Sequence, residues 1–118
     1  MMTDLAGSMA KLLAMWMDRD PRSRRSTIET HLAPDVEFRS PFGQARGYEE
    51  LEKYSDFLQG KYPSTGFFVD GPVQVIGDYV RLPFVLKEHD GSTVATGQDF
   101  LRLAADGRAE LMYAFFDE

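Results

Sequence analysis

The 118-residue sequence contains no cysteine, which excludes a disulfide framework and any metal site built on thiolates. It has two histidines, His31 and His89, which lie far apart and show no spacing typical of metal ligands. Its ten glycines form neither a dinucleotide-binding nor a phosphate-loop fingerprint. We therefore expect no metal and no cofactor.

Positive charge and long apolar runs are also scarce. The formal net charge is −6, from 13 Lys and Arg against 19 Asp and Glu, whereas a nucleic-acid surface needs clustered cations. The one basic cluster, Arg22 to Arg25, lies beside two aspartates, and we interpret it as a solvated helix face. No apolar run reaches the ~20 residues that span a bilayer, and the N-terminal segment does not resemble a signal peptide. We expect a cytoplasmic protein that binds neither nucleic acid nor membrane.

Apolar and aromatic residues are plentiful. They make up 43% and 13% of the chain, which is too much for a disordered protein. A chain of this length can bury a core without disulfides or metals. Because no linker or internal repeat divides the sequence, residues 1–118 are predicted to form a single domain.

The first half of the chain has helical periodicity. A first helix is indicated by apolar residues at positions 5, 9, 12, 13 and 16. A second helix is predicted to begin with Asp20 as its N-cap and to end before Pro34. A third begins near Tyr48 and ends at the segment 60–66. Its predicted buried stripe consists of Leu51, Tyr54, Phe57 and Leu58.

The second half has the alternation of strands. Four strand-like segments, 72–76, 79–87, 93–103 and 108–116, are separated by pairs of Asp and Gly of the kind that close tight hairpins. They predict an antiparallel meander. Helices followed by such a meander indicate an α+β fold with the helices packed on one face of the sheet.

One residue of this meander is out of place. In the segment 97–103, alternation puts Asp99 on the same face as Leu101 and Leu103. An ionised carboxylate is costly to bury, so such an aspartate is either satisfied locally or functional. Desolvation by apolar neighbours should raise its pKa, so that it rests protonated and can donate a hydrogen bond.

Two stretches of the chain resemble a known superfamily. "RRSTIETHLAPDVEFRSPFGQARGYEELEKY" and "GQDFLRLAADGRAELMYAFFD" are similar to nuclear transport factor 2-like proteins, and within them to SnoaL-like and ketosteroid-isomerase-like proteins. The resemblance implies a cystatin-like cone, in which a curved antiparallel sheet wraps around three helices and encloses an apolar cavity. It also implies a homodimer through the outer sheet face, where Gln98, Phe100 and Arg102 would lie.

The comparison with ketosteroid isomerases fails in part. Their oxyanion acid lies in a strand motif similar to "QDFLRL", so its counterpart is Asp99. The place of their catalytic base is taken by Ser40, whose hydroxyl is too weakly acidic for that role, and the place of their oxyanion tyrosine falls near Leu13. Steroid-type isomerase chemistry is therefore disfavoured.

The SnoaL-like, polyketide cyclase-like proteins offer a second template. There a single acidic residue serves as both acid and base in an aldol ring closure. The resemblance implies Asp99 in that role, with Ser40 or Tyr54 as a hydrogen-bonding helper.

Two functions stay open from the sequence. One is a cofactor-free cyclase, isomerase or dehydratase that takes a small hydrophobic or amphiphilic ligand and uses Asp99 as its catalytic residue. The other is a non-catalytic binding or dimerisation module whose cavity is filled by its own side chains. The residues predicted to line the cavity are Trp16, Ser40, Tyr54, Phe57, Phe84, Leu101, Met112 and Phe116.

Overall fold

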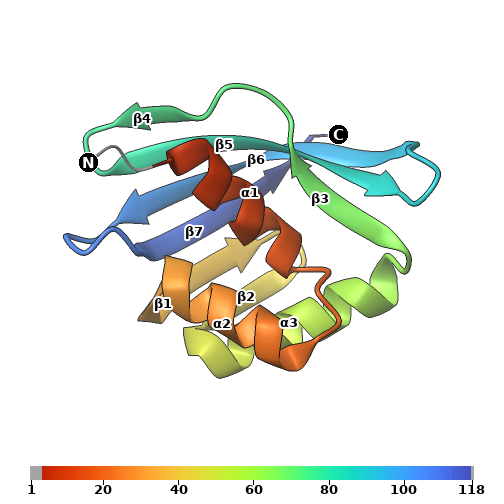
Figure 1. The fold of residues 1–118 in the computed structure, drawn as a ribbon, viewed down its shortest axis with the longest axis horizontal. Helices are drawn as coiled ribbons and strands as arrows, with labels where there is room; N and C mark the ends of the chain where they lie inside the picture. Colours follow the sequence, from red (N-terminus) through yellow and green to blue (C-terminus); the bar gives the residue numbers. More distant parts are fainter. Residues whose placement is uncertain (1–3, 118) are drawn as a thin grey trace.

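The structure, a computed structural model, describes residues 4–117. Its three helices are α1 (Leu5–Met15), α2 (Pro21–His31) and α3 (Gly47–Lys61). Its seven strands are β1 (Leu32–Ser40), β2 (Gly43–Arg46), β3 (Thr65–Val69), β4 (Gln74–Ile76), β5 (Tyr79–Glu88), β6 (Thr93–Leu103) and β7 (Ala109–Phe116). The fold is α+β, with α1 lying across one face of the sheet and α2 and α3 side by side beyond one end of α1 (Figure 1).

The helix boundaries follow from local chemistry. The side chain of Asp20 accepts a hydrogen bond from the backbone N–H of Arg22, and Pro21 occupies the first helical position of α2, as the sequence predicts. The helix ends at His31, before Pro34, and the chain passes directly into β1. In α3 the first turn carries two glutamates, whose negative charges interact favourably with the positive end of the helix dipole.

The sheet has the strand order β2-β1-β7-β6-β5-β3, and β4 pairs with β5. The predicted antiparallel meander, from β4 through β5 and β6 to β7, is confirmed. The sheet as a whole is mixed rather than antiparallel, because β1 pairs in parallel with β7. Strand β3 was not singled out by the sequence; it forms because it pairs with β5.

The pairing along one edge of β5 is interrupted beside Pro83, between β3 and β4. Pairing of β3 with β5 ends at Val69 and Phe84, and pairing of β4 with β5 resumes at Gln74 and Arg81. Proline has no N–H to donate, so the ladder breaks beside it and residues 70–73 leave the sheet.

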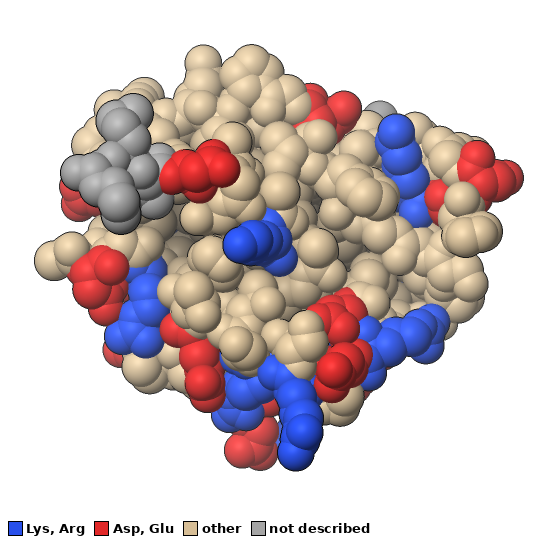
Figure 2. All heavy atoms as spheres, in the orientation of Figure 1, with Lys and Arg blue, Asp and Glu red and all other residues tan. Residues whose placement is uncertain are grey.

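A buried arginine of α2 links this helix to α3. Arg24 of α2 is 6% exposed, and its Nη2 lies 3.4 Å from a carboxylate oxygen of Asp56 and 3.7 Å from one of Glu52, both on α3. Its Nη1 also donates to the hydroxyl of Ser55 at 3.4 Å. The interpretation of residues 22–25 as a solvated face is therefore wrong at Arg24. Charges of both signs alternate over this part of the molecule, while much of the remaining face is uncharged (Figure 2).

Candidate functional site

The placement of Asp99 follows from the register of β6. Asp99 lies opposite Leu82 of β5 and Ala114 of β7, and its side chain faces the helices. It is 2% exposed, while Phe100, the next residue, faces outward, so the predicted alternation is confirmed. Asp99 is thus flanked by a neighbouring strand on either side.

Small residues make room beside this carboxyl group. A Cβ at Gly97 would overlap the carbonyl oxygen of Phe115 and would lie 2.6 Å from Cζ of Phe84. The absence of a side chain therefore lets the Phe84 ring lie over β6, next to Asp99. Ala114, which pairs with Asp99 on the neighbouring strand, has a small side chain and leaves further space on the same face.

These gaps leave a pocket at the centre of the molecule. Its free volume of about 10 Å³ gives room for about one water molecule. Its wall combines residues of α1 and its C-cap, of α3 and of five strands. The lining residues are Leu13, Trp16, Phe38, Tyr54, Leu58, Phe67, Phe84, Asp99, Ala114 and Phe116.

The pocket is walled by aromatic rings. Trp16, Phe38 and Tyr54 form one side, with ring centroids 4.7 to 5.3 Å apart. Phe84 forms the other side, 5.5 Å from Phe67 and 5.2 Å from Phe116. Such tilted and edge-on contacts hold each ring in place.

Asp99 has no partner in this wall. Among residues 4–117, no hydrogen bond or ion pair to its carboxyl group offsets its burial. Desolvation therefore raises the pKa of Asp99 well above its ordinary value and favours the protonated form. A protonated carboxyl group in such surroundings can donate one hydrogen bond into the pocket.

Tyr54 and Ser40 form the second polar feature of the site. Their hydroxyl oxygens lie 2.7 Å apart, and either can donate. The hydroxyl oxygen of Ser40 also accepts a hydrogen bond of 3.1 Å from the backbone N–H of Phe42. Burial raises the pKa of Tyr54 to about 12, so neither hydroxyl is a base near neutral pH.

The pocket wall continues to the surface as an aromatic rim. We define this rim as Phe42, Phe57, Tyr62 and Phe116. The Phe42 ring, on the turn between β1 and β2, lies 5.3 Å from Phe116, 6.0 Å from Phe57 and 6.3 Å from Tyr62. Phe42 is 37% exposed and Phe57 is 47% exposed. The prediction that Phe57 belongs to the buried stripe of α3 is therefore wrong: its ring lies beside Phe42 at the rim, whereas the next residue, Leu58, is buried.

The structure brings five of the predicted residues to the pocket. Trp16, Tyr54, Phe84 and Phe116 line it together with Asp99.

The other predicted residues lie elsewhere. Ser40 reaches the pocket through its hydrogen bond to Tyr54. Leu101 and Met112 are fully buried but belong to the packed core outside the pocket wall, and Phe57 lies at the rim. The role of all these residues in binding stays a prediction.

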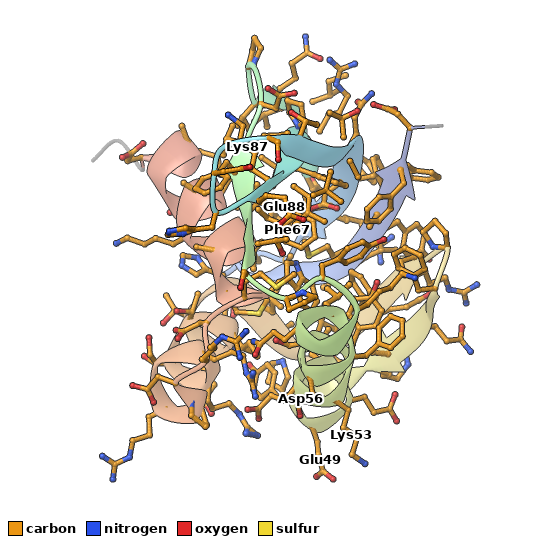
Figure 3. The ribbon with its side chains drawn as sticks, turned by 90° about the vertical axis from the view of Figure 1, so that its right-hand side faces the viewer. Glu49, Lys53, Asp56, Phe67, Lys87 and Glu88 are labelled. Carbon is orange, nitrogen blue, oxygen red and sulfur yellow. The ribbon has the colours of Figure 1, made fainter. Side chains whose placement is uncertain are left out.

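Five wall residues were not predicted to line the cavity: Leu13, Phe38, Leu58, Phe67 and Ala114. Phe38 shares a face of β1 with Val36 and Ser40, so strict alternation over residues 36–40 could have pointed to it. Phe67 lies on β3, whose pairing is long-range and leaves no comparable signal; Figure 3 shows it above α3. Leu13, the place of the isomerase tyrosine, lines the pocket with an apolar side chain.

Residues 4–117 offer neither a metal site nor a membrane-spanning helix. No group of three or more His, Asp or Glu side chains is close enough to hold a metal ion. No helix of the described chain is sufficiently long and apolar to cross a membrane.

Solved structures with the same architecture are numerous. A candidate isomerase of the SnoaL-like family from Agrobacterium tumefaciens has a TM-score of 0.89 and 26% identity, covering 99% of this chain and 100% of its own. A nuclear transport factor 2-like protein of unknown function from Exiguobacterium sp. 255-15 has a TM-score of 0.74 and 17% identity, covering 94% and 98%. A candidate SnoaL-like polyketide cyclase from Jannaschia sp. CCS1 has a TM-score of 0.74 and 21% identity, covering 94% and 83%. No protein-family model and no curated protein sequence matches.

Proposed function

This chain is a nuclear transport factor 2-like protein, and we propose that it binds a small hydrophobic or amphiphilic molecule beside Asp99 and rearranges it without a cofactor. The observation that supports this proposal is the buried carboxyl group of Asp99, which faces an aromatic pocket without a protein partner. A carboxylic acid kept neutral by an apolar site is suited to donate to an oxygen atom of a ligand.

In this proposal, the hydrogen bond that Asp99 donates to the ligand lowers the barrier of the reaction. In a site without water, a hydrogen bond to a carbonyl oxygen is stronger than in solution and stabilises negative charge as it develops there. The aromatic walls position a flat or aliphatic body against Asp99, and the Ser40–Tyr54 pair orients a second polar group. Asp99 is the general acid of this proposal.

The lack of a base limits the reactions that fit. Since Ser40 and Tyr54 are poor bases, Asp99 must both give and take the proton. In an aldol closure of an enol, the acid proton of Asp99 passes to the carbonyl oxygen as the new C–C bond forms. The enol O–H then returns its proton to the carboxylate, and Asp99 ends protonated. The substrate class is therefore a molecule that is already enolised, such as a 1,3-dicarbonyl compound.

The neighbours support this class of reaction. A neighbour that covers 99% of this chain at 26% identity is described as a candidate isomerase, and another neighbour as a candidate polyketide cyclase. Isomerisation and cyclisation both move one proton without a net redox change. Asp99 needs no cofactor for either.

Enol–keto tautomerisation of benzoylacetone tests the proposal. The enol absorbs in the ultraviolet, and its ketonisation needs one proton given to carbon and one taken from oxygen. We expect the protein to accelerate this decay above the buffer rate and Asp99→Asn to lose the acceleration while its circular dichroism is unchanged. Asp35→Asn, the same change at an exposed position, is the control and should keep full activity. Equal rates for the parent protein and Asp99→Asn would contradict a catalytic Asp99.

One observation favours a second function. The free volume of about 10 Å³ is the space of a single water molecule, as expected if the cavity is filled by its own side chains. The chain would then be a non-catalytic binding or dimerisation module. Binding of N-phenyl-1-naphthylamine, whose fluorescence rises in an apolar site, separates the two. Saturable binding supports an opening pocket, and no binding supports a filled one.

We also propose that the chain forms a homodimer through the outer sheet face. Tyr79, Phe100 and Phe115 are 43%, 36% and 60% exposed on neighbouring strands β5, β6 and β7. Monomeric soluble proteins rarely expose aromatic side chains in such a continuous group.

A further inference from the structure

Lys61, the last residue of α3, lies over the aromatic rim. Its Nζ is 5.2 Å from the ring centroid of Phe42 and 5.4 Å from that of Tyr62. The Phe42 ring in turn contacts Phe116, which lines the pocket beside Asp99. The ammonium group is thus separated from the pocket wall by one aromatic ring.

No carboxylate of residues 4–117 lies within 4.0 Å of this ammonium group. Lys53, on the same helix, differs: it pairs with Glu49 at 3.9 Å, and both lie at the other end of α3 (Figure 3). In a chain of net charge −6, an ammonium group without an acidic partner stands out at a pocket entrance.

Entry into the pocket requires the rim to move. A free volume of about 10 Å³ admits no organic ligand until a ring is displaced. Phe42 is the ring best placed to move, because it is on a two-residue turn, 37% exposed, and is not itself part of the pocket wall. Its displacement takes one of two aromatic faces away from Lys61, while Tyr62 remains, and the exposed ammonium group is then open to an anionic partner at the rim.

We infer that this partner is an anionic group of the ligand, so that the pocket selects amphiphilic acids. The apolar body of such a ligand enters past Phe42 towards Asp99, and its carboxylate or sulfonate stays at the rim and pairs with Lys61. This inference rests on the proposed binding function of the pocket. Beyond that function, it specifies the charge of the ligand and names Lys61 as the residue that recognises this charge.

Lys61 also has a structural role, since a cation in the last turn of a helix interacts favourably with the negative end of the helix dipole. That role is the same whether a bound ligand is charged or neutral. A comparison of two ligands that differ in charge alone therefore separates the two roles.

The experiment uses two probes with one skeleton. 1-Anilinonaphthalene-8-sulfonate is anionic, and N-phenyl-1-naphthylamine is its neutral counterpart. We expect Lys61→Gln to weaken binding of the anionic probe by about three- to fivefold and to leave binding of the neutral probe unchanged. Lys53→Gln, the same change on the same helix, should alter neither affinity. Added salt should weaken binding of the anionic probe to the parent protein more than its binding to Lys61→Gln.

Two further variants locate the bound probe. Ala114→Leu, which fills the pocket, should abolish binding of both probes, whereas Phe115→Glu on the outer face should leave both affinities unchanged. If neither probe binds the parent protein, the proposed binding function fails. If both bind in the pocket and Lys61→Gln affects them equally, the inference about ligand charge is overturned while the binding function stands.

Discussion

The carboxyl group of Asp99 owes its properties to residues that are far apart in the sequence. Leu82 and Ala114 flank it across the sheet, and Trp16 and Tyr54 cover it from the helices. Strand alternation alone places it on the inner face, so this much of the site could be predicted from the sequence. The absence of a hydrogen-bonding partner could not be, because it depends on which side chains of the other elements reach it.

The buried acid makes stability depend on pH. Its pKa is raised in the folded state and is about 3.9 in the unfolded state, so between the two values the folded protein binds one more proton. The free energy of unfolding should therefore fall with rising pH, by up to about 1.4 kcal/mol per pH unit from this group. Asp99→Asn removes the contribution. In urea unfolding from pH 4 upward, the variant should gain stability relative to the parent protein, and parallel pH profiles would contradict a raised pKa.

At the level of elements, the sequence predicts what is local. The three helices and four of the strands follow from periodicity, capping and Asp/Gly turns. The parallel pairing of β1 with β7 and the presence of β3 do not, because both depend on partners distant in the chain. Phe57 shows the same limit: its helical spacing matches that of Tyr54, but nothing in the spacing says that its ring lies beside Phe42 at the rim rather than in the core.

The close approach of β6, β5 and β7 depends on one glycine. Gly97→Ala places a Cβ against the backbone of Phe115 and the ring of Phe84, neither of which can move freely. We expect a loss of about 3 kcal/mol or more in the free energy of unfolding. The control is Gly60→Ala on α3, where no atom lies within 4 Å of the new Cβ, and a gain of about 0.5 kcal/mol is expected. Equal effects in urea unfolding would contradict the packing described.

The junction of α2 with α3 depends on a buried charge. Arg24→Met keeps much of the side-chain volume but removes the cation from Ser55 and Asp56, while Glu52 keeps its ion pair with Arg25 at 2.7 Å. We expect a loss of about 2–3 kcal/mol in the free energy of unfolding, because the buried donor network is broken. Arg22→Met, an exposed position on the same helix, should change stability by no more than about 0.5 kcal/mol. A similar loss at both positions would show that burial at Arg24 is not the cause.

For the whole molecule, the two faces of the sheet have different roles. The inner face packs on α1 and α3 and holds the pocket, and the outer face presents aromatic side chains to solvent. Alternation along β6 connects them: Asp99 points inward and Phe100 outward. A dimer formed through the outer face would therefore lie on the side of the sheet opposite the pocket.

Sedimentation velocity tests this arrangement. Phe115→Glu places a charge on the outer face, and we expect it to convert a dimer into a folded monomer. Phe57→Glu introduces the same charge on the helical side of the molecule and should leave the dimer intact. A parent protein that sediments as a monomer would contradict the proposed dimer.

The protonation state of Asp99 is measured most directly by the carboxyl ¹³C resonance of that residue, assigned by its absence in Asp99→Asn and followed by NMR from pH 3 upward. Exposed aspartates should change their shift near the ordinary pKa of about 3.9. For Asp99 we expect the resonance of a protonated acid to persist well above that pH. An inflection near pH 4 would show an ordinary, solvated carboxylate and would contradict a neutral acid in an apolar pocket.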